Sequence, residues 1–173
     1  MSPNKLASSF PLGIELPKEL KKLCEWNEVN GYPISGGFEL RQHDDKTIQC
    51  WFGTAKPIGF LAQFGAGPDG SLYCIWKHNG DFLIVHMGSE GQNNFVLASN
   101  PVDFLRLLAI GYDEIGFADL SLPPENEDEI NPSFQDWVSI NFNVPIPKTG
   151  NEITGPLQGI SDNFQSWIDS QTD

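Results

Sequence analysis

Alternating hydrophobic positions in the middle of the chain predict a β-hairpin. Two β-prone runs, Leu72–Lys77 and Phe82–Met87, flank the short polar stretch 78–81. Its two central residues, Asn79 and Gly80, form the pair that most strongly favours a two-residue hairpin turn, because both must adopt positive φ. This turn pairs Lys77 with Phe82 and, further out, Tyr73 with His86.

The predicted register sorts the hairpin side chains onto two faces. The first face is wholly apolar and is expected to pack on helices: Leu72, Cys74, Trp76, Leu83, Val85 and Met87. The second face is apolar with polar ends, and we expect it to be only partly covered or presented to a partner: Tyr73, Ile75, Lys77, Phe82, Ile84 and His86. A slip of one residue would bury Lys77 and His86, so the register is well determined.

Turn and capping signals place the remaining elements around this hairpin. A proline suited to a first helical position and a following glycine predict a helix from Pro17 to about Glu28. An N-cap asparagine, Asn100, predicts another helix that ends at Gly111. Further strands are predicted at 38–41, 48–52 and 93–98, a helix from 131 to before 145, a loop at 149–156, and a last helix capped by Ser161.

These elements predict one α+β domain, in which a central, mainly antiparallel sheet is backed by helices. Residues 1–15 lack periodicity and are predicted to be a flexible tail, and residues 16–173 form the domain. Its core is expected within 16–111, followed by a helical, acidic C-terminal part, 112–173.

Composition narrows the class of protein. Of the 173 residues, 39% are hydrophobic and 12% aromatic, which is enough to build a core. The three cysteines have no C-x-x-C spacing, so a reducing, cytoplasmic compartment fits better than a disulfide framework. No signal-peptide core and no run of 18 apolar residues is present, so the chain is expected to be neither secreted nor membrane-spanning.

Negative charge is concentrated in the last third of the chain. The net charge is −13, yet residues 1–111 carry 9 basic and 11 acidic side chains, whereas residues 112–173 carry 1 basic and 12 acidic. Such a block repels nucleic acid and anionic membranes and attracts cationic partners. Solubility alone is the other explanation of this block. An acidic run such as 125–129 is usually just a solvated loop, and its functional interpretation is a docking surface for a basic site.

Four segments, in their order and spacing, resemble the SUKH superfamily of Smi/Knr-like domains. They are 60–76, a strand with a Gly/Asp-rich loop; 84–91, which ends in Glu90-Gly91; the short strand 96–100; and the Phe-Leu-x-Leu-Leu helix at 104–108. The resemblance implies a mixed α+β sheet fold. It further implies, for bacterial members, an immunity protein that binds and neutralises a cognate toxin, often a nuclease. Regulatory interaction proteins occur in the same superfamily.

Several sequence features that could suggest a catalytic or ligand site have simpler structural explanations. The glycine-rich loop 65–71 lacks the Lys-Ser/Thr of a P-loop and precedes a strand, so a tight turn is favoured. Cys74 and His86 fall on opposite faces, which argues against a zinc site with His78. A carboxylate pair of Asp69 and Glu90 would suit glycoside chemistry, although such loop carboxylates more commonly cap turns.

The sequence therefore predicts a protein-binding domain and not an enzyme, with no cofactor and no metal. The expected partner is a cationic toxin domain, with no nucleic acid or membrane, and the chain itself is expected to be a monomer or weak homodimer. An endogenous partner or ligand bound by a regulatory scaffold is the alternative. Predicted partner contacts come from the second sheet face, the hairpin loops and the acidic run: Asp69, Tyr73, Lys77, His86, Ser89, Glu90, Glu125, Glu127, Asp128 and Glu129.

Overall fold

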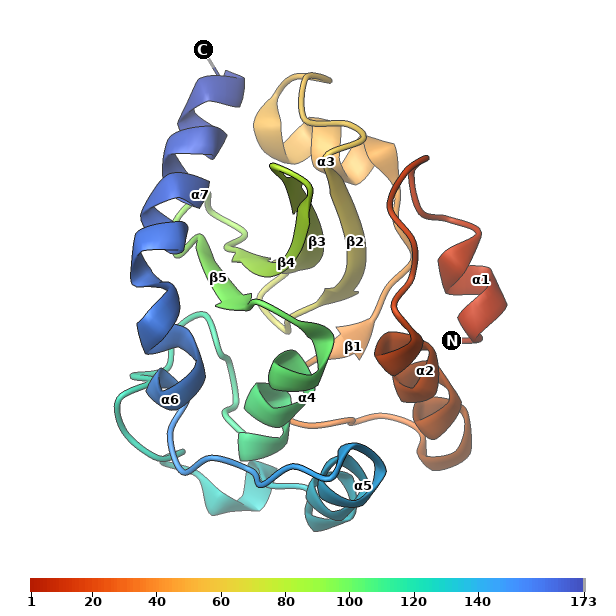
Figure 1. Cartoon of the computed structure of the whole chain (residues 1–173), viewed down its shortest axis with the longest axis vertical. Helices are drawn as coiled ribbons and strands as arrows, with labels where there is room; N and C mark the ends of the chain where they lie inside the picture. Colours follow the sequence, from red (N-terminus) through yellow and green to blue (C-terminus); the bar gives the residue numbers. More distant parts are fainter. Residues whose placement is uncertain (173) are drawn as a thin grey trace.

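A five-stranded antiparallel sheet forms the centre of the protein. The computed structural model describes residues 1–172, except for the side chain of Glu129. The strands lie in chain order in the sheet, so each pairs with its neighbours in sequence (Figure 1). Their bounds are β1 (Glu39–Leu40), β2 (Leu61–Ala66), β3 (Leu72–His78), β4 (Asp81–Met87) and β5 (Phe95–Ala98). Together with the helices they make one α+β domain, as predicted.

The β3–β4 hairpin has the predicted turn and register. Asn79 and Gly80 have φ values of 51° and 91°, which are the positive angles that a two-residue hairpin turn of this kind needs. Lys77 pairs with Phe82 and Tyr73 with His86, and every pair between them matches the prediction. The two faces of the hairpin are therefore assigned correctly from sequence.

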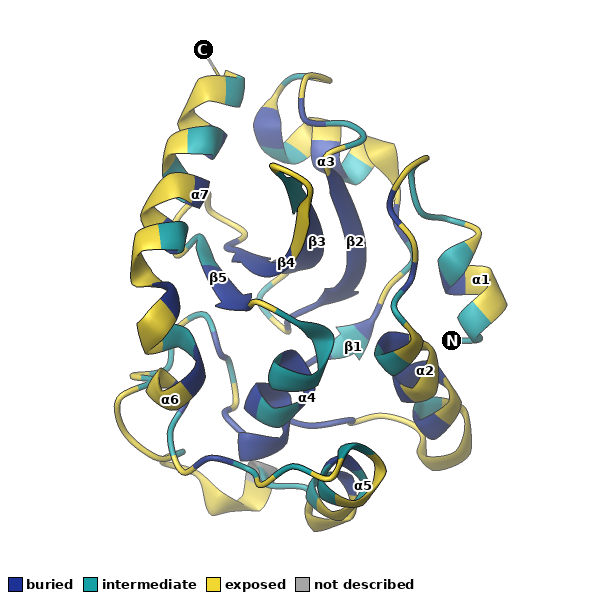
Figure 2. Ribbon diagram, viewed as in Figure 1, coloured by how far each residue is buried: buried dark blue, intermediate teal, exposed yellow. Residues whose placement is uncertain are grey.

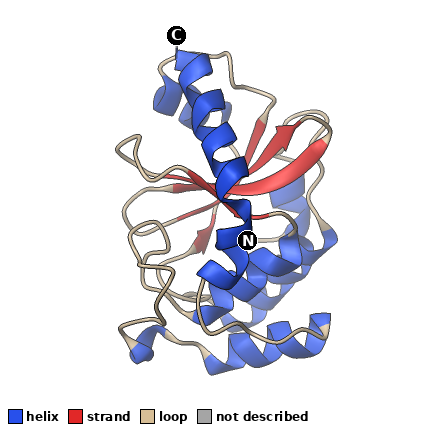
Figure 3. Ribbon diagram, turned by 60° about the vertical axis from the view of Figure 1, so that its left-hand side comes forward, coloured by secondary structure: helices blue, strands red, loops and turns tan. Residues whose placement is uncertain are grey.

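The first face of the hairpin packs on two helices. Its six apolar residues all belong to one buried cluster with side chains of α3 (Asp45–Phe52) and α7 (Gln158–Thr172). Trp76 is the largest of them and is fully buried, with its ring 4.7 Å from that of Phe164 on α7. Figure 3 shows the helix that ends at the C-terminus, α7, lying across one side of the sheet.

The second face is covered by the main core, contrary to the expectation of a partly covered face. Helices α1 (Pro3–Ala7), α2 (Lys18–Asn30), α4 (Pro101–Ile110) and α5 (Pro132–Phe142) supply the cluster on this side. Tyr73, Ile75, Ile84 and His86 are all buried, and only Phe82, beside the turn, is exposed. Figure 2 shows the central strands as buried and the outer faces of the surrounding helices as exposed.

The capping residues in the sequence correctly predict the ends of helices α2 and α4 and the start of α5. Helix α2 begins one residue after Pro17 and is followed by its C-cap, Gly31, while α4 lies between its predicted caps, Asn100 and Gly111. Asn100 accepts a hydrogen bond at Oδ1 from the backbone N–H of Asp103, at 2.9 Å. Asn131 caps α5 in the same way, through the N–H of Phe134.

Three local predictions are wrong. Residues 48–52 form the end of helix α3 and not a strand, because Asp44 caps a helix whose buried residues, Ile48 and Phe52, are four apart. The predicted loop 149–156 contains α6 (Asn151–Thr154) and the start of a 3-10 turn, η2 (Gly155–Leu157). Ser161 lies inside α7, where its hydroxyl accepts a hydrogen bond from the N–H of Val96 in edge strand β5.

The first fifteen residues are part of the core and not a tail. They include helix α1, in which Leu6 is fully buried, and a following segment in which Ile14 is buried. Both side chains belong to the main cluster. Likewise, Phe134 of α5 and Phe164 of α7 complete the two clusters, so the chain after Gly111 is integral to the domain.

Replacing Asn100 with alanine tests the cap of α4. Asn100→Ala removes the hydrogen bond to Asp103 and should lower the free energy of unfolding by about 1 kcal/mol. Asn163→Ala, at an exposed interior position of α7, is the control and should raise it by a few tenths of a kcal/mol because alanine is the better helix former. Urea unfolding followed by circular dichroism measures both, and equal midpoints for the two variants would contradict the capping role.

Candidate functional site

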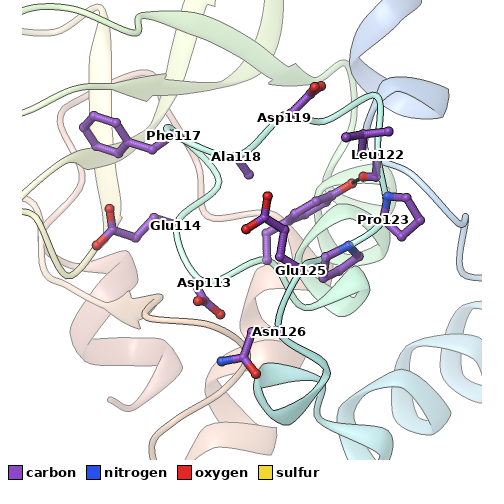
Figure 4. Close-up of a pocket in the computed structure, with 11 residues that line it drawn as sticks. Asp113, Glu114, Phe117, Ala118, Asp119, Leu122, Pro123, Glu125 and Asn126 are labelled. Atoms are coloured by element: carbon purple, nitrogen blue, oxygen red, sulfur yellow. Dashed lines mark hydrogen bonds between the residues drawn. The ribbon is translucent and has the colours of Figure 1, made fainter.

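The acidic segment, residues 112–129, forms a hollow on the surface. Its seven acidic side chains have no basic residue among them in the sequence. An open pocket of about 340 Å³ lies within it, and Figure 4 shows the side chains that line the pocket. They are Tyr112, Asp113, Glu114, Phe117, Ala118, Asp119, Leu122, Pro123, Pro124, Glu125 and Asn126. We call this the acidic pocket.

Backbone and side-chain hydrogen bonds hold the acidic segment in place. The buried Tyr112 donates its hydroxyl hydrogen to the carbonyl of Leu122, at 2.6 Å, and accepts from the N–H of Gly150, at 2.9 Å. Burial raises the pKa of Tyr112, so the hydroxyl keeps the proton that it donates. The N–H of Asn151 donates to the carbonyl of Leu120 at 2.7 Å, and that of Gly37 to the carbonyl of Asp113 at 3.0 Å.

One carboxylate of the acidic pocket, that of Asp119, is hydrogen-bonded within the loop. Asp119 accepts hydrogen bonds from the hydroxyl of Ser121 at 2.6 Å and from its N–H at 3.0 Å. These bonds lower the pKa of Asp119. Asp113, Glu114 and Glu125 make no such bond or ion pair among the described residues, so their charges face solvent or a ligand.

Two large apolar side chains project beside these charges. Phe117 is 63% exposed and Leu122 is 53% exposed, and both line the acidic pocket. Exposed aromatic and aliphatic side chains next to unpaired carboxylates are typical of a protein-binding surface, where the apolar groups anchor and the charges select the partner.

The sheet supports the acidic segment through His86. Gly116 packs so closely on the imidazole that an added Cβ atom would overlap it. The ring Nδ1 lies 2.8 Å from the carbonyl of Asn93, so the proton of the neutral ring is on Nδ1. Burial lowers the pKa of His86 against the opposing effects of Asn93 and Asp69, which leaves the imidazole neutral near pH 7.

The predicted contact residues do not form one surface. Tyr73 and His86 are both buried, which corrects their predicted role as partner contacts. His86 lies against Gly116 of the acidic segment, whereas the ring of Tyr73 packs on those of Phe38 and His86. Burial raises the pKa of Tyr73. Lys77 lies near the turn of the hairpin, with its ammonium nitrogen beside Gly13.

Asp69, Ser89 and Glu90 lie at the other end of the hairpin, away from its turn. The Asp69 carboxylate accepts from the N–H of Ser71, at 3.1 Å, and from the hydroxyl of Ser89, at 3.4 Å. Partial burial acts to raise its pKa, but the bonds from Ser71 prevail and lower it. Asp69 is thus a turn-capping carboxylate, while Ser89 and Glu90 are exposed.

Within the acidic run, Glu125, Glu127 and Asp128 are exposed, as a contact surface requires. Glu125 lines the acidic pocket, whereas Glu127 begins a short 3-10 turn, η1 (Glu127–Glu129). The side chain of Glu129 lies outside what the structure describes. The sequence analysis did not identify four residues that line the acidic pocket: Asp113, Glu114, Phe117 and Leu122. Asp113 and Glu114 could have been found, because they belong to the same stretch without lysine or arginine as the acidic run.

No cluster of three or more His, Cys, Asp or Glu side chains suited to a metal ion occurs in residues 1–172. Cys74 and His86 lie on opposite faces of the sheet, as the register predicted. Over the same residues, the helices are too short or too polar to cross a membrane. The chain matches no protein-family model, no curated protein and no solved structure.

Substituting Gly116 tests the support of the acidic segment by His86. Gly116→Ala should lower the free energy of unfolding by about 1–3 kcal/mol, because the new methyl group must displace the segment or the imidazole. Gly159→Ala in α7, where a Cβ atom meets nothing within 4 Å, should instead stabilise by about 0.5–1 kcal/mol. Urea unfolding distinguishes the two, and similar effects would rule out the close packing.

The buried His86 predicts a pH dependence of stability. The unfolded chain binds a proton at this residue near pH 6.5, whereas the folded protein resists it because the pKa is lowered. Stability contributed by His86 is therefore fully present above about pH 6.5 and is lost as the pH falls below it. In His86→Gln the difference in unfolding free energy between pH 7 and pH 5 should shrink, and an unchanged difference would contradict the assignment.

Proposed function

We propose that this chain is a protein-binding domain that neutralises a cationic toxin domain by covering it, with the acidic segment as its principal contact. One observation carries this proposal. Unpaired carboxylates are gathered around an open pocket, next to exposed Phe117 and Leu122, on a segment that Tyr112 and His86 hold in place. A surface that is already fixed in one conformation loses less conformational entropy on binding than a flexible one, which favours affinity.

Charge supports a basic partner. The acidic segment carries carboxylates that find no cation among the described residues, and the chain as a whole carries −13. Opposite charge raises the rate of association and excludes acidic partners. Domains that act on nucleic acid present basic surfaces, so a nuclease toxin is the kind of partner that fits this charge.

The toxin role rests on the resemblance to the SUKH superfamily, and the proposed place of action is the cytoplasm. All three cysteines are free, Cys24 and Cys74 buried and Cys50 exposed, which suits a reducing compartment. A basic endogenous protein, bound by the same acidic segment in a regulatory role, is the alternative outcome of the experiment below.

A triple variant that neutralises the acidic pocket tests the proposal. Asp113→Asn, Glu114→Gln and Glu125→Gln remove three charges and leave the Asp119 cap intact. Association with a candidate basic toxin domain, chosen from the genes that neighbour the gene of this chain, should slow about tenfold at low ionic strength, with a smaller effect in high salt. Stopped-flow or surface-plasmon measurements give the rate, and growth of cells that express the toxin gives the protection.

The matched control removes three charges elsewhere. Glu25→Gln, Glu28→Gln and Asp136→Asn are exposed positions on α2 and α5. This control should keep the association rate within about twofold. Equal slowing by the two triple variants would show that net charge alone matters, and failure of every candidate toxin domain to bind would overturn the toxin role. Tight binding of a basic housekeeping protein would instead favour the regulatory role.

A further inference from the structure

Helix α2 presents a stripe of mostly charged side chains to solvent. Its members lie three or four residues apart, so they share one side of the helix. All of them are exposed: Lys18, Lys21, Lys22, Glu25, Glu28 and Val29. The other side of α2, which includes Leu20 and Leu23, is buried in the main cluster. We call the exposed side the α2 stripe, and none of its residues lines the acidic pocket.

The charges of the α2 stripe are segregated along the helix. The three lysines lie in the first half and both glutamates in the second. Like charges are therefore neighbours, as with Lys18 and Lys22, which disfavours an isolated helix. The helix dipole disfavours cations in the first turn, which holds Lys18 and Lys21, and anions in the last turn, which holds Glu28. Glu19, in the first turn, offsets only part of this effect.

Contacts within the chain leave most of these charges unpaired. Among residues 1–172, Lys21, Glu25 and Glu28 form no ion pair. Lys18 lies 3.9 Å from Glu19, but the Lys18 side chain is 86% exposed, so this pair contributes little. A charge pattern that is unfavourable in the single chain is therefore available to a partner.

We propose that the α2 stripe is the interface of a weak, symmetric dimer, in which α2 packs antiparallel on α2 of a second copy of the chain. With the twofold axis at the level of residue 23, Lys21 lies opposite Glu25 of the other copy and Lys18 lies opposite Glu28. The symmetry makes each of these pairs occur twice. Antiparallel packing also sets the two helix dipoles against one another, which is favourable. This inference does not depend on the proposed function.

Self-complementarity selects a second copy as the occupant. In chain order α2 presents lysines and then glutamates, and in the opposite direction it presents glutamates and then lysines. An antiparallel copy therefore supplies the opposite charge in both halves of the stripe. Nucleic acid or an anionic membrane would be repelled by the glutamates, and a uniformly basic protein would be repelled by the lysines.

The net charge of the chain does not prevent this approach. Each copy carries −13, but residues 112–173, with 1 basic and 12 acidic side chains, hold −11 of it. Helix α2 itself has 3 lysines and 3 glutamates and is neutral. Two α2 stripes therefore meet without bringing a net charge together, and repulsion from the rest of the chain is screened beyond roughly 8 Å at physiological salt.

The small size of the interface sets the expected affinity. The 13 residues of α2 span only about 20 Å. Val29, which is 85% exposed, would lie opposite Pro17 of the other copy and add an apolar contact. We expect a dissociation constant of about 0.1 mM, in keeping with a small, mostly polar interface. At micromolar concentrations the chain is then a monomer, so the dimer does not affect measurements of association with other proteins.

Charge reversal on α2 tests the dimer. The acidic variant, Lys18→Glu with Lys21→Glu, and the basic variant, Glu25→Lys with Glu28→Lys, each place like charges opposite one another. Each variant alone should dimerise at least tenfold more weakly than the unaltered chain. An equal mixture of the two should form a heterodimer, because each acidic position then meets a basic one. Sedimentation equilibrium at about 0.5 mM measures the mass in each sample.

The full reversal combines all four substitutions in one chain and restores the complementary pattern. It should dimerise within about threefold of the unaltered chain, which shows that the altered residues are compatible with the fold. It also moves anions to the first turn of α2 and cations towards the last, so its unfolding temperature should rise. Lys22, whose ammonium lies 5.3 Å from the centre of the Phe142 ring, is left unchanged throughout.

The matched control reverses two exposed carboxylates outside α2. Glu127→Lys with Asp128→Lys changes the net charge as the basic variant does and should leave the dimer within about threefold. A chain that is monomeric at about 1 mM would overturn the proposal, as would a mixture of the acidic and basic variants that fails to associate. Equal weakening by the control, or anionic vesicles that bind the unaltered chain but not the acidic variant, would also overturn it.

Discussion

Both faces of the central sheet are buried, and the turn at Asn79 and Gly80 decides which residues of the β3–β4 hairpin serve which face. A shift of one residue would exchange the cluster around Trp76 for the side chains that now contact α4 and the acidic segment. The rest of the domain depends on this assignment, because α3 and α7 can pack only on a wholly apolar face. The other face must carry His86, whose neutral ring supports Gly116.

The acidic segment is costly to hold in one place because its carboxylates repel one another. Its position is set by neutral groups instead: the Tyr112 hydroxyl, the N–H groups of Gly37 and Asn151, and the imidazole of His86. None of these bonds uses the carboxylates of Asp113, Glu114 or Glu125, so their charge remains available to a partner. The residues that hold the segment and the residues that would contact a partner are thus separate sets, and His86, which belongs to the first set, is buried.

The accuracy of sequence reasoning followed the range of the interactions that determine each feature. The hairpin turn and the caps at Asn100 and Asn131 depend on residues at most a few positions apart, and the turn then sets the pairing of the strands, so the sequence was sufficient for them. Residues 48–52 form a mostly apolar run that is too short to distinguish a strand from the end of a helix, and the cap at Asp44 favours the helix. The placement of Leu6 and Ile14 depends on contacts with residues far along the chain, which no local pattern encodes. The same holds for the acidic pocket: the charge was visible in sequence, but the contributions of Phe117 and Leu122 required the fold.

The charged and the apolar side chains of the acidic pocket differ in what they would contribute to binding. Carboxylates around the acidic pocket act over roughly a Debye length, about 8 Å at physiological salt, and so influence mainly the rate of encounter. Phe117 and Leu122 act only on contact, and their burial by a partner would slow dissociation. The proposed capture of a cationic protein needs both effects, because charge alone would give fast, short-lived complexes and apolar contact alone would give slow, long-lived ones.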